Sequence, residues 1–392
     1  MDKADVVIIG GGIVGSAAAY FLSMDAAFRG RMVVVERDPS YAESSTGRSA
    51  GGLRQQFSTR ENIAMSQFTL AIIRRLKTIF GPDADVGFRE QGYLVLASPQ
   101  SRTVLAENVA LQQSMHAEIA LIEPPELARQ FPWLCMEGIA AAGLGLEGEG
   151  WFDPPSLAAL FRNAAKTRGA VFLHGEVDRI DVRAERAEVV RLAGGDSIAC
   201  RALINAAGPW AGKVAALAGL RLPVEPRKRY VYVIDCRNAP EALHQAPLAV
   251  DPSGVWFRPE GRYFLCGLSP PEDKEPPAVD LADIDHAYFE AEVWPRLAAR
   301  VPAFESVKVV NAWAGYYDTN TLDHNAVIGP HPDVGNFYFA NGFSGHGAQQ
   351  AAAAGRAMAE LIVHGAFLTI DLTRLGYGRI VGSQPLLERN VI

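Results

Sequence analysis

A glycine-rich turn between an apolar strand and a helix stands near the start of the chain. Residues 6–9 form a short apolar run of the kind that is buried in parallel sheets. Gly10, Gly12 and Gly15 follow directly and form the pattern G-x-G-x-x-G, and residues 13–22 have apolar side chains at helical spacing. A strand, a tight turn and a helix in this order predict the opening of a βαβ unit.

The same turn predicts a dinucleotide site. In such a unit the first glycine permits the tight turn, the second lets a pyrophosphate approach the backbone, and the third allows the helix to pack closely on the strand. The helix N-terminus at Ile13 and Val14 offers free N–H groups to the phosphates. Glu36 ends the next apolar run, residues 32–35, where a carboxylate can bond the ribose hydroxyls and disfavours a 2′-phosphate. NADP is therefore a poor candidate, whereas NAD and FAD both remain.

Composition favours small-molecule chemistry. The chain has 392 residues, which predicts two domains, and its net charge of −7 argues against binding to nucleic acid or to an anionic membrane. The four cysteines form no metal-type pair, and we expect neither a metal site nor a disulfide framework. No apolar run approaches the length of a membrane span. The early first strand leaves no room for a signal peptide, so we expect a cytoplasmic protein.

Two kinds of sequence pattern alternate along the chain. Helical periodicity followed by apolar strands is typical of the nucleotide-binding domain, and strand-like alternation between proline-rich turns predicts a separate, largely antiparallel sheet. We expect helices over 62–80, 151–169 and 348–363, and strands over 170–173, 202–206, 229–234, 255–267 and 337–340. The fold class is therefore α/β, with a second domain of mixed, largely antiparallel sheet. The domain limits that follow are 1–85, 145–223 and 318–392 for the first domain, and 86–144 and 224–317 for the second.

Four segments in order along the chain resemble the D-amino-acid oxidase and sarcosine oxidase superfamily of FAD-dependent oxidoreductases. They are Val7–Gly15, Arg48–Gly52, Asn205–Trp210 and Asn341–Gly347. Three further segments are similar to one branch, that of the mitochondrial FAD-dependent oxidoreductase domain protein associated with complex I assembly and its bacterial relatives. These are Pro226–Val233, Trp313–Asp318 and 388–392.

The resemblance implies that the cofactor is FAD. It also implies oxidation of a small amine or amino acid, of the N-alkyl or D-amino-acid class, to an imine by hydride transfer to the flavin. We predict a cofactor site assembled from small, glycine and hydroxyl-bearing residues of several segments. Its members are Gly10, Gly12, Ile13, Val14, Gly15, Glu36, Arg37, Ser44, Ser45, Thr46, Arg48, Ser49, Ala50, Gly51, Gly52, Val177, Ala206, Ala207, Gly208, Trp210, Gly315, Tyr316, Gly342, Gly345, His346, Gly347 and Ala348. His346 is expected either to contact the flavin or to bond the loop backbone.

Several positions depart from the family pattern. Relatives that attach the flavin covalently use a histidine or a cysteine at positions that match Ser49 and Gly315, so we expect FAD to bind non-covalently. The arginine and lysine that hold the substrate carboxylate in monomeric sarcosine oxidases match Phe57 and Gln349. Their oxygen-activating lysine matches Leu265, so the electron acceptor is open between oxygen and a quinone or protein.

Other side chains are candidates for the substrate site. Arg54 and Arg258 are predicted to replace the missing clamp, because an arginine fork suits a planar carboxylate. Tyr317 and Gln349 complete the predicted catalytic set, and Trp256 and Tyr232 are candidate aromatic walls, with a core role favoured for Tyr232. Two other functions remain: oxidation of a hydroxy acid, and a flavin-binding assembly or scaffold protein in which FAD is structural.

Overall fold

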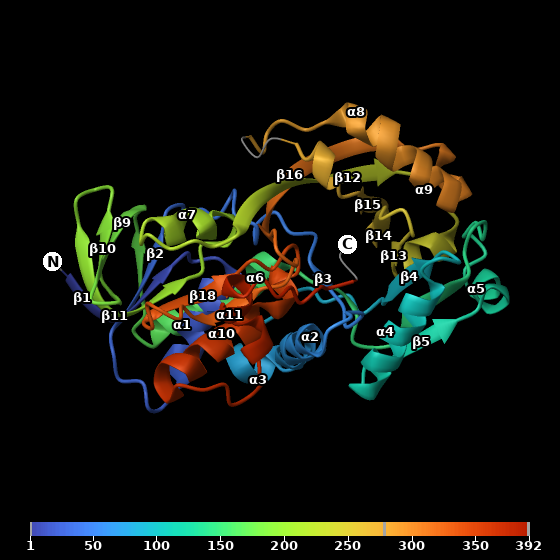
Figure 1. Cartoon of the computed structure of the whole chain (residues 1–392). Helices are drawn as coiled ribbons and strands as arrows, with labels where there is room; N and C mark the ends of the chain where they lie inside the picture. Colours follow the sequence, from blue (N-terminus) through green and yellow to red (C-terminus); the bar gives the residue numbers. More distant parts are fainter. Residues whose placement is uncertain (1, 277–279, 390–392) are drawn as a thin grey trace.

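The computed structural model describes residues 2–276 and 280–389, so the last three residues of the segment 388–392 lie outside the described part. Two eight-stranded sheets lie in different halves of the molecule, and long strands of the second sheet reach toward the first (Figure 1). The predicted fold class is confirmed: one sheet is rich in parallel strands, and the other is mixed and largely antiparallel.

The first sheet is built on the predicted βαβ unit. Its main path has the order β17-β18-β11-β1-β2-β8, and β18, β11, β1, β2 and β8 run parallel. The last four residues of β1 and the first four of β2 are buried, as expected of a sheet covered on both faces. The strands are β1 (Asp2–Ile9), β2 (Met32–Glu36), β8 (Val171–His174), β9 (Val177–Arg183), β10 (Arg186–Leu192), β11 (Ser197–Asn205), β17 (Val327–Pro330) and β18 (Phe337–Asn341).

Helices pack on this sheet through small residues. A Cβ placed on Gly355 would lie 2.6 Å from the backbone carbon of Ala17, so the helices that carry these residues, α1 and α10, approach at their backbones. Helices α1, α2, α6 and α10 lie near this sheet in Figure 1, and their apolar side chains form one buried cluster with those of β1 and β2. The helices of this half are α1 (Ile13–Met24), α2 (Arg60–Ile73), α3 (Leu76–Phe80), α6 (Pro154–Thr167), α7 (Ala211–Ala216), α10 (Gly347–His364) and α11 (Gly378–Val381).

The second sheet has the order β16-β12-β15-β14-β13-β4-β6-β5, and all of its pairs are antiparallel except β13 with β4. Its strands are β4 (Tyr93–Ala97), β5 (Ile119–Ile122), β6 (Ala141–Gly145), β12 (Val224–Asp235), β13 (Leu248–Val250), β14 (Trp256–Glu260), β15 (Tyr263–Gly267) and β16 (Lys308–Asn320). Helices α4 (Arg102–Ser114), α5 (Pro124–Gln130), α8 (His286–Tyr288) and α9 (Trp294–Arg300) accompany it (Figure 1). A two-stranded ribbon of β3 (Gly52–Leu53) and β7 (Gly150–Trp151) completes the strands.

Two predicted helices have different limits in the structure. The helix predicted over 62–80 is two helices, because the chain leaves the α-helical ladder at Arg74 and Arg75 while Leu76 still faces the core. The helix predicted from residue 151 begins at Pro154, because the Asp153 side chain caps it by accepting a bond from the backbone N–H of Ser156. The domain limits stay a prediction, and β16 runs across the limit placed at residue 318.

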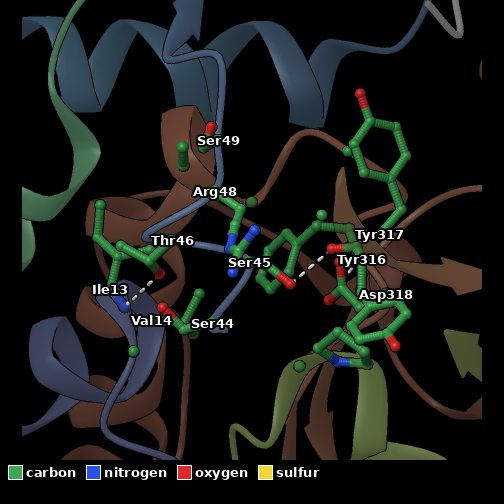
Figure 2. Close-up of a pocket in the computed structure, with 18 of the residues that line it drawn as sticks. Ile13, Val14, Ser44, Ser45, Thr46, Arg48, Ser49, Tyr316, Tyr317 and Asp318 are labelled. Carbon is green, nitrogen blue, oxygen red and sulfur yellow. Dashed lines mark hydrogen bonds between the residues drawn. The ribbon is translucent and has the colours of Figure 1, made fainter. Parts of the chain in front are cut away.

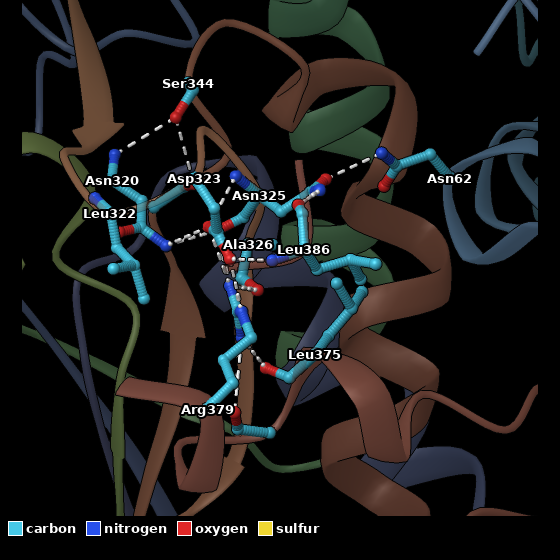
Figure 3. A network of polar contacts seen from close by, with 12 residues as sticks. Asn62, Asn320, Leu322, Asp323, Asn325, Ala326, Ser344, Leu375, Arg379 and Leu386 are labelled. Carbon is cyan, nitrogen blue, oxygen red and sulfur yellow. Dashed lines mark hydrogen bonds and ion pairs between the residues drawn. The ribbon is translucent and has the colours of Figure 1, made fainter. Parts of the chain in front are cut away.

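A buried polar network fastens the C-terminal segment to the loop after β16 (Figure 3). The guanidinium of Arg379 pairs with Asp323 at 2.7 Å and donates to the carbonyls of Asn325 and Ala326, each at 2.8 Å. Farther along, the Glu388 carboxylate accepts bonds from the backbone N–H and the hydroxyl of Ser58, both at 2.7 Å. The C-terminal segment therefore supports the start of α2, directly after the loop that carries Arg54.

Candidate active site

A cavity of about 890 Å³ lies against residues of both sheets. Its wall joins segments that are far apart in sequence, from Ile9 to Gln349. Most predicted site residues line it: Gly10, Gly12, Ile13, Val14, Glu36, Arg37, Ser44, Ser45, Thr46, Arg48, Ser49, Ala50, Gly51, Gly52, Arg54, Val177, Ala206, Ala207, Gly208, Trp210, Gly315, Tyr316, Tyr317, Gly345, His346, Gly347, Ala348 and Gln349. Gly15, Gly342 and Arg258 are not part of the wall.

The three glycines of the first turn differ in what surrounds them. A Cβ on Gly10 would lie 2.4 Å from the carbonyl oxygen of Ala206, and one on Gly15 would lie 1.9 Å from that of Gly10. Both glycines therefore permit close backbone packing. A Cβ on Gly12 would approach only the Thr46 hydroxyl, at 3.3 Å, so this residue faces the cavity. The structure thus leaves space beside the N-terminus of α1, where a pyrophosphate binds in folds of this kind.

The Glu36 carboxylate is fixed at the end of β2. Its Oε2 accepts a bond from the N–H of Gly11 at 2.7 Å, and its Oε1 accepts one from the N–H of Asp38 at 2.8 Å. Nearby, the guanidinium carbon of Arg37 and the Nζ of Lys213 lie 4.7 and 4.5 Å from the ring centroid of Trp210. The Trp210 ring therefore contacts two cations of the cavity wall.

Residues 44–52, which we call the flavin loop, are bonded to β16. The Ser45 hydroxyl donates to the carbonyl of Tyr316 at 2.6 Å, and the Thr46 hydroxyl accepts a bond from the N–H of Ile13 at 3.1 Å (Figure 2). A Cβ on Gly315 would lie 3.0 Å from the Cβ of Arg48. The flavin loop thus bridges the first helix and β16 across the cavity.

Arg54 is buried in the cavity wall just beyond β3. Arg54 is only 2% exposed, and its guanidinium carbon lies 4.0 Å from the ring centroid of Phe57. The guanidinium bonds the carbonyl of Gln56 and the Nε2 of His346, the latter at 3.1 Å. The backbone N–H of Arg54 donates to the amide oxygen of Gln349 at 2.8 Å. Arg54, His346 and Gln349 are therefore brought together as one unit.

His346 is neutral in this setting. Burial, and next the nearby charge of Arg54, hold the pKa of the imidazole well below its ordinary value. A neutral imidazole can accept the bond from Arg54 through Nε2. The structure thus shows His346 bonded to an arginine side chain, and it also lines the cavity.

Two buried carboxylates hold the loops that frame the site. Asp318 accepts bonds from the N–H groups of Gly342 and Phe343 at 2.8 and 3.1 Å, and burial raises the pKa of its carboxyl to about 6. Glu149 accepts bonds from the N–H of Gln56 at 3.1 Å and from its side-chain amide at 2.8 Å, and burial raises the pKa of Glu149 to about 7. Asp318 thus holds the glycine-rich turn before α10, and Glu149 holds the loop that carries Arg54.

Two predicted substrate residues lie elsewhere. The Arg258 guanidinium pairs with Glu260, donates to the carbonyl of Ala50 at 3.1 Å and stacks on Trp151, outside the cavity wall. The structure therefore does not bring Arg258 to the cavity that Arg54 lines, contrary to the prediction that both could hold substrate. Tyr232 is fully buried in the core of the second sheet, as favoured, and its hydroxyl donates to the carbonyl of Asp285 at 2.6 Å.

The sequence analysis did not single out Tyr93, Lys213 or Arg229, which all line the cavity. A signal for Arg229 existed, because alternation along the predicted strand 229–234 places it on the same face as Val231. The pairing of β12 with β16 determines which face of β12 turns toward the cavity. No local sequence pattern predicts that pairing. Tyr93 stands at the start of β4 in the second sheet, remote in sequence from the other wall residues.

The described residues fit FAD. Two helices of suitable length, α1 and α10, begin at the cavity, and in neither does the N-cap side chain bond the first turn. In α1 the N–H of Ile13, predicted to be free, donates to the Thr46 hydroxyl. The positive ends of both helices suit an anionic cofactor. Within residues 2–276 and 280–389 no group of three or more metal-ligating side chains is placed to hold a metal ion, and no helix there is long and apolar enough to cross a membrane.

Comparisons with known proteins agree with this geometry. The sequence matches the FAD dependent oxidoreductase family over residues 5–361. It is 44% identical to FAD-dependent oxidoreductase domain-containing protein 1 of Xenopus laevis over 100% of this chain and 85% of that protein. It is 28% identical to the mitochondrial dimethylglycine dehydrogenase of Mus musculus over 98% of this chain and 45% of that protein. Among solved structures, L-proline dehydrogenase from P. horikoshii has a TM-score of 0.85 at 25% identity, covering 98% of this chain and 99% of that one.

The fold, the glycine turn and the cavity define a flavin-dependent oxidoreductase. More particularly, the chain belongs to the DAO family of FAD-dependent oxidoreductases.

Proposed function

We propose that this protein oxidises a small amine or amino acid bearing a carboxylate to an imine, with FAD bound non-covalently. The observation that carries the proposal is the position of Arg54, buried in the cavity wall two residues beyond the end of the flavin loop. An arginine fork binds two carboxylate oxygens at once, and a buried carboxylate requires such a partner. The names of the similar dimethylglycine and L-proline dehydrogenases also support a substrate of the amino-acid class.

The residues of the chain bind and orient this substrate. Arg54 fixes the carboxylate, and Tyr93 and Tyr317 supply aromatic walls that exclude water from the reacting carbon. The N-terminal end of α10 at Gly347 faces the cavity and favours negative charge there. When bound, FAD supplies the redox chemistry by accepting a hydride from the carbon next to nitrogen.

Non-covalent binding is supported by the side chains at the two family attachment positions. Ser49 has a hydroxyl that accepts a bond from the N–H of Gly51 at 3.1 Å, and Gly315 has no side chain. Neither residue offers the imidazole or thiolate that such a link needs.

We also propose that electrons leave to a quinone or protein faster than to oxygen. Leu265 is 5% exposed and lies in an apolar cluster with Val231 and Val233, so this position supplies no positive charge to the cavity. Stopped-flow reoxidation by air at the rate of turnover would argue against this part of the proposal.

An anaerobic screen of amines and amino acids, followed by bleaching of flavin absorbance, tests the function. A product assay for ammonia or free amine distinguishes amine oxidation from oxidation of a hydroxy acid.

Arg54→Ala should raise KM and lower kcat/KM at least about tenfold, because a charge-assisted bond contributes about 1.5 to 3 kcal/mol. Arg54→Lys should rescue poorly, since a point charge cannot reproduce the fork. Native kinetics in Arg54→Ala would contradict the carboxylate assignment, and no bleaching by any substrate would favour a structural FAD.

A further inference from the structure

A second guanidinium lines the cavity from the opposite sheet. Arg229 lies on β12 directly opposite Gly315 of β16, so the two residues share one face of the antiparallel ladder. That face turns toward the flavin loop, because a Cβ on Gly315 would nearly touch Arg48, at 3.0 Å. Gly315 thus lets Arg48 of the flavin loop pack closely on β16, and both Gly315 and Arg229 line the cavity.

Glu275 holds this guanidinium at one edge. The distances Nη1–Oε2 and Nη2–Oε1 are both 2.7 Å, and the two side chains are only 15% and 10% exposed. Glu275 itself is not part of the cavity wall. It therefore fixes the orientation of Arg229 from behind the wall.

The edge of the guanidinium that carries Nε is not fully bonded. Its Nε is buried and, within residues 2–276 and 280–389, has no hydrogen-bond acceptor. A buried donor without an acceptor costs on the order of 1 to 3 kcal/mol. The Nε and Nη2 groups together form a second two-point edge that matches a carboxylate. Because Arg229 lines the cavity, a ligand oxygen that reaches this edge would satisfy the donor.

Arg229 and Arg54 act on a common neighbour. The guanidinium carbon of Arg229 lies 5.5 Å from the ring centroid of Tyr317. Burial raises the pKa of the Tyr317 hydroxyl, and the charges of Arg229 and Arg54 both oppose that rise. Two cations, one from the loop after β3 and one from β12, therefore lie within electrostatic reach of the same side chain.

We propose that Arg229 is a second anion-binding residue of the substrate site and that the substrate is an amine bearing two carboxylates. One carboxylate binds Arg54 and the other binds the Nε–Nη2 edge of Arg229. Glu275 is a positioning residue that holds the guanidinium by its Nη1–Nη2 edge. The inference rests on the proposed function, because it names the substrate class of the same site.

Two unreactive probes test it with the FAD-loaded protein. Glutarate has two carboxylates, and glutaramate has the same length with one carboxylate replaced by a neutral amide. Titration of each, followed by the flavin absorbance spectrum, gives the two dissociation constants. Glutarate should bind at least about tenfold more tightly than glutaramate, the size expected of one charge-assisted contact.

Variants assign this preference to Arg229. Arg229→Gln should weaken glutarate to the level of glutaramate and leave FAD content and glutaramate affinity unchanged. Glu275→Gln keeps an acceptor for the guanidinium and removes the negative charge beside it, so the preference for glutarate should increase. Arg227→Gln, on the same strand and outside the cavity wall, is the matched control and should change neither affinity.

Equal binding of the two probes by the native protein would overturn the inference, and so would an Arg229→Gln variant that keeps the preference. If Arg229→Gln loses FAD, the Glu275→Gln variant is the deciding test. An unchanged preference of Glu275→Gln for glutarate over glutaramate would then overturn the inference. Failure of the proposed function is visible separately, because Arg54→Ala would then bind glutaramate as tightly as the native protein does.

Discussion

The backbone at Gly12 borders an open space, and the pyrophosphate of FAD is expected to lie there. Apart from its chain neighbours, only the Thr46 hydroxyl would lie within 4 Å of a Cβ there. Gly12→Val is therefore expected to fold and to lose FAD, because the branched side chain enters the path of the pyrophosphate. Flavin absorbance per chain measures the loss, and circular dichroism checks the fold. Gly194→Val, at a turn glycine whose Cβ would meet nothing within 4 Å, should keep its FAD. Native FAD content in Gly12→Val would refute the assigned site.

Glu149 predicts a pH dependence of stability. Burial raises the pKa of its carboxyl from 4.5 to about 7, so the folded state binds more protons than the unfolded state between these values. Its contribution to the free energy of unfolding is therefore largest below pH 4.5 and falls, by on the order of 3 kcal/mol, as pH rises to about 7. Glu149→Gln should lack this decline in urea titrations with excess FAD. The exposed Glu147→Gln should retain it. A decline of native size in Glu149→Gln would show that another group causes it.

At the scale of elements, helix α10 has a glycine near each end, and the two glycines differ in one respect. Gly345 and Gly365 both have positive φ, +98° and +72°, so alanine strains the backbone at either position. A Cβ on Gly345 would also lie 2.4 Å from the Tyr317 ring, whereas one on Gly365 would meet nothing within 4 Å. Gly365→Ala should lower the free energy of unfolding by about 1 kcal/mol and leave the site intact.

Gly345→Ala should additionally displace Tyr317. We expect a changed flavin spectrum and weaker binding of carboxylate probes, measured by the same absorbance titration in both variants. Identical behaviour of the two variants would mean that the contact between Gly345 and Tyr317 has no role in the site.

The same elements show what the sequence could and could not predict. The opening β1–α1–β2 unit follows from local signals, because apolar runs and glycines define both its geometry and its ligand. The break between α2 and α3 does not, since Leu76 continues the apolar face across it. The start of α6 could have been predicted from Asp153 and the two prolines after it, although the sequence analysis placed it at residue 151. Arg229 was missed because its role depends on a partner strand almost ninety residues away, in the pairing of Arg229 with Gly315.

At the scale of the whole molecule, the cavity belongs to neither sheet alone. Its wall takes Gly12 from the first turn, Tyr93 and Arg229 from the second sheet, and His346 from the loop before α10. Motifs predicted most of the residues that line the cavity from the first sheet and the flavin loop, since each glycine or serine segment has a local reason to lie there. The substrate side is formed by side chains from distant strands, so Arg258 and Arg54 looked equivalent in sequence. Only the fold separates them, because Arg258 is paired with Glu260 outside the wall.

Under the proposed non-covalent binding, FAD in a cavity lined by so many segments should stabilise the whole fold by mass action. Free FAD at one hundred times its dissociation constant is expected to raise the free energy of unfolding by about 2.7 kcal/mol, because it binds the folded chain and not the unfolded one. Thermal unfolding at increasing FAD concentration measures this shift. Acid precipitation should then leave the yellow colour in the supernatant as intact FAD, since Ser49 and Gly315 offer no attachment. Flavin that stays on the precipitated polypeptide, together with a melting temperature independent of added FAD, would show that the link is covalent.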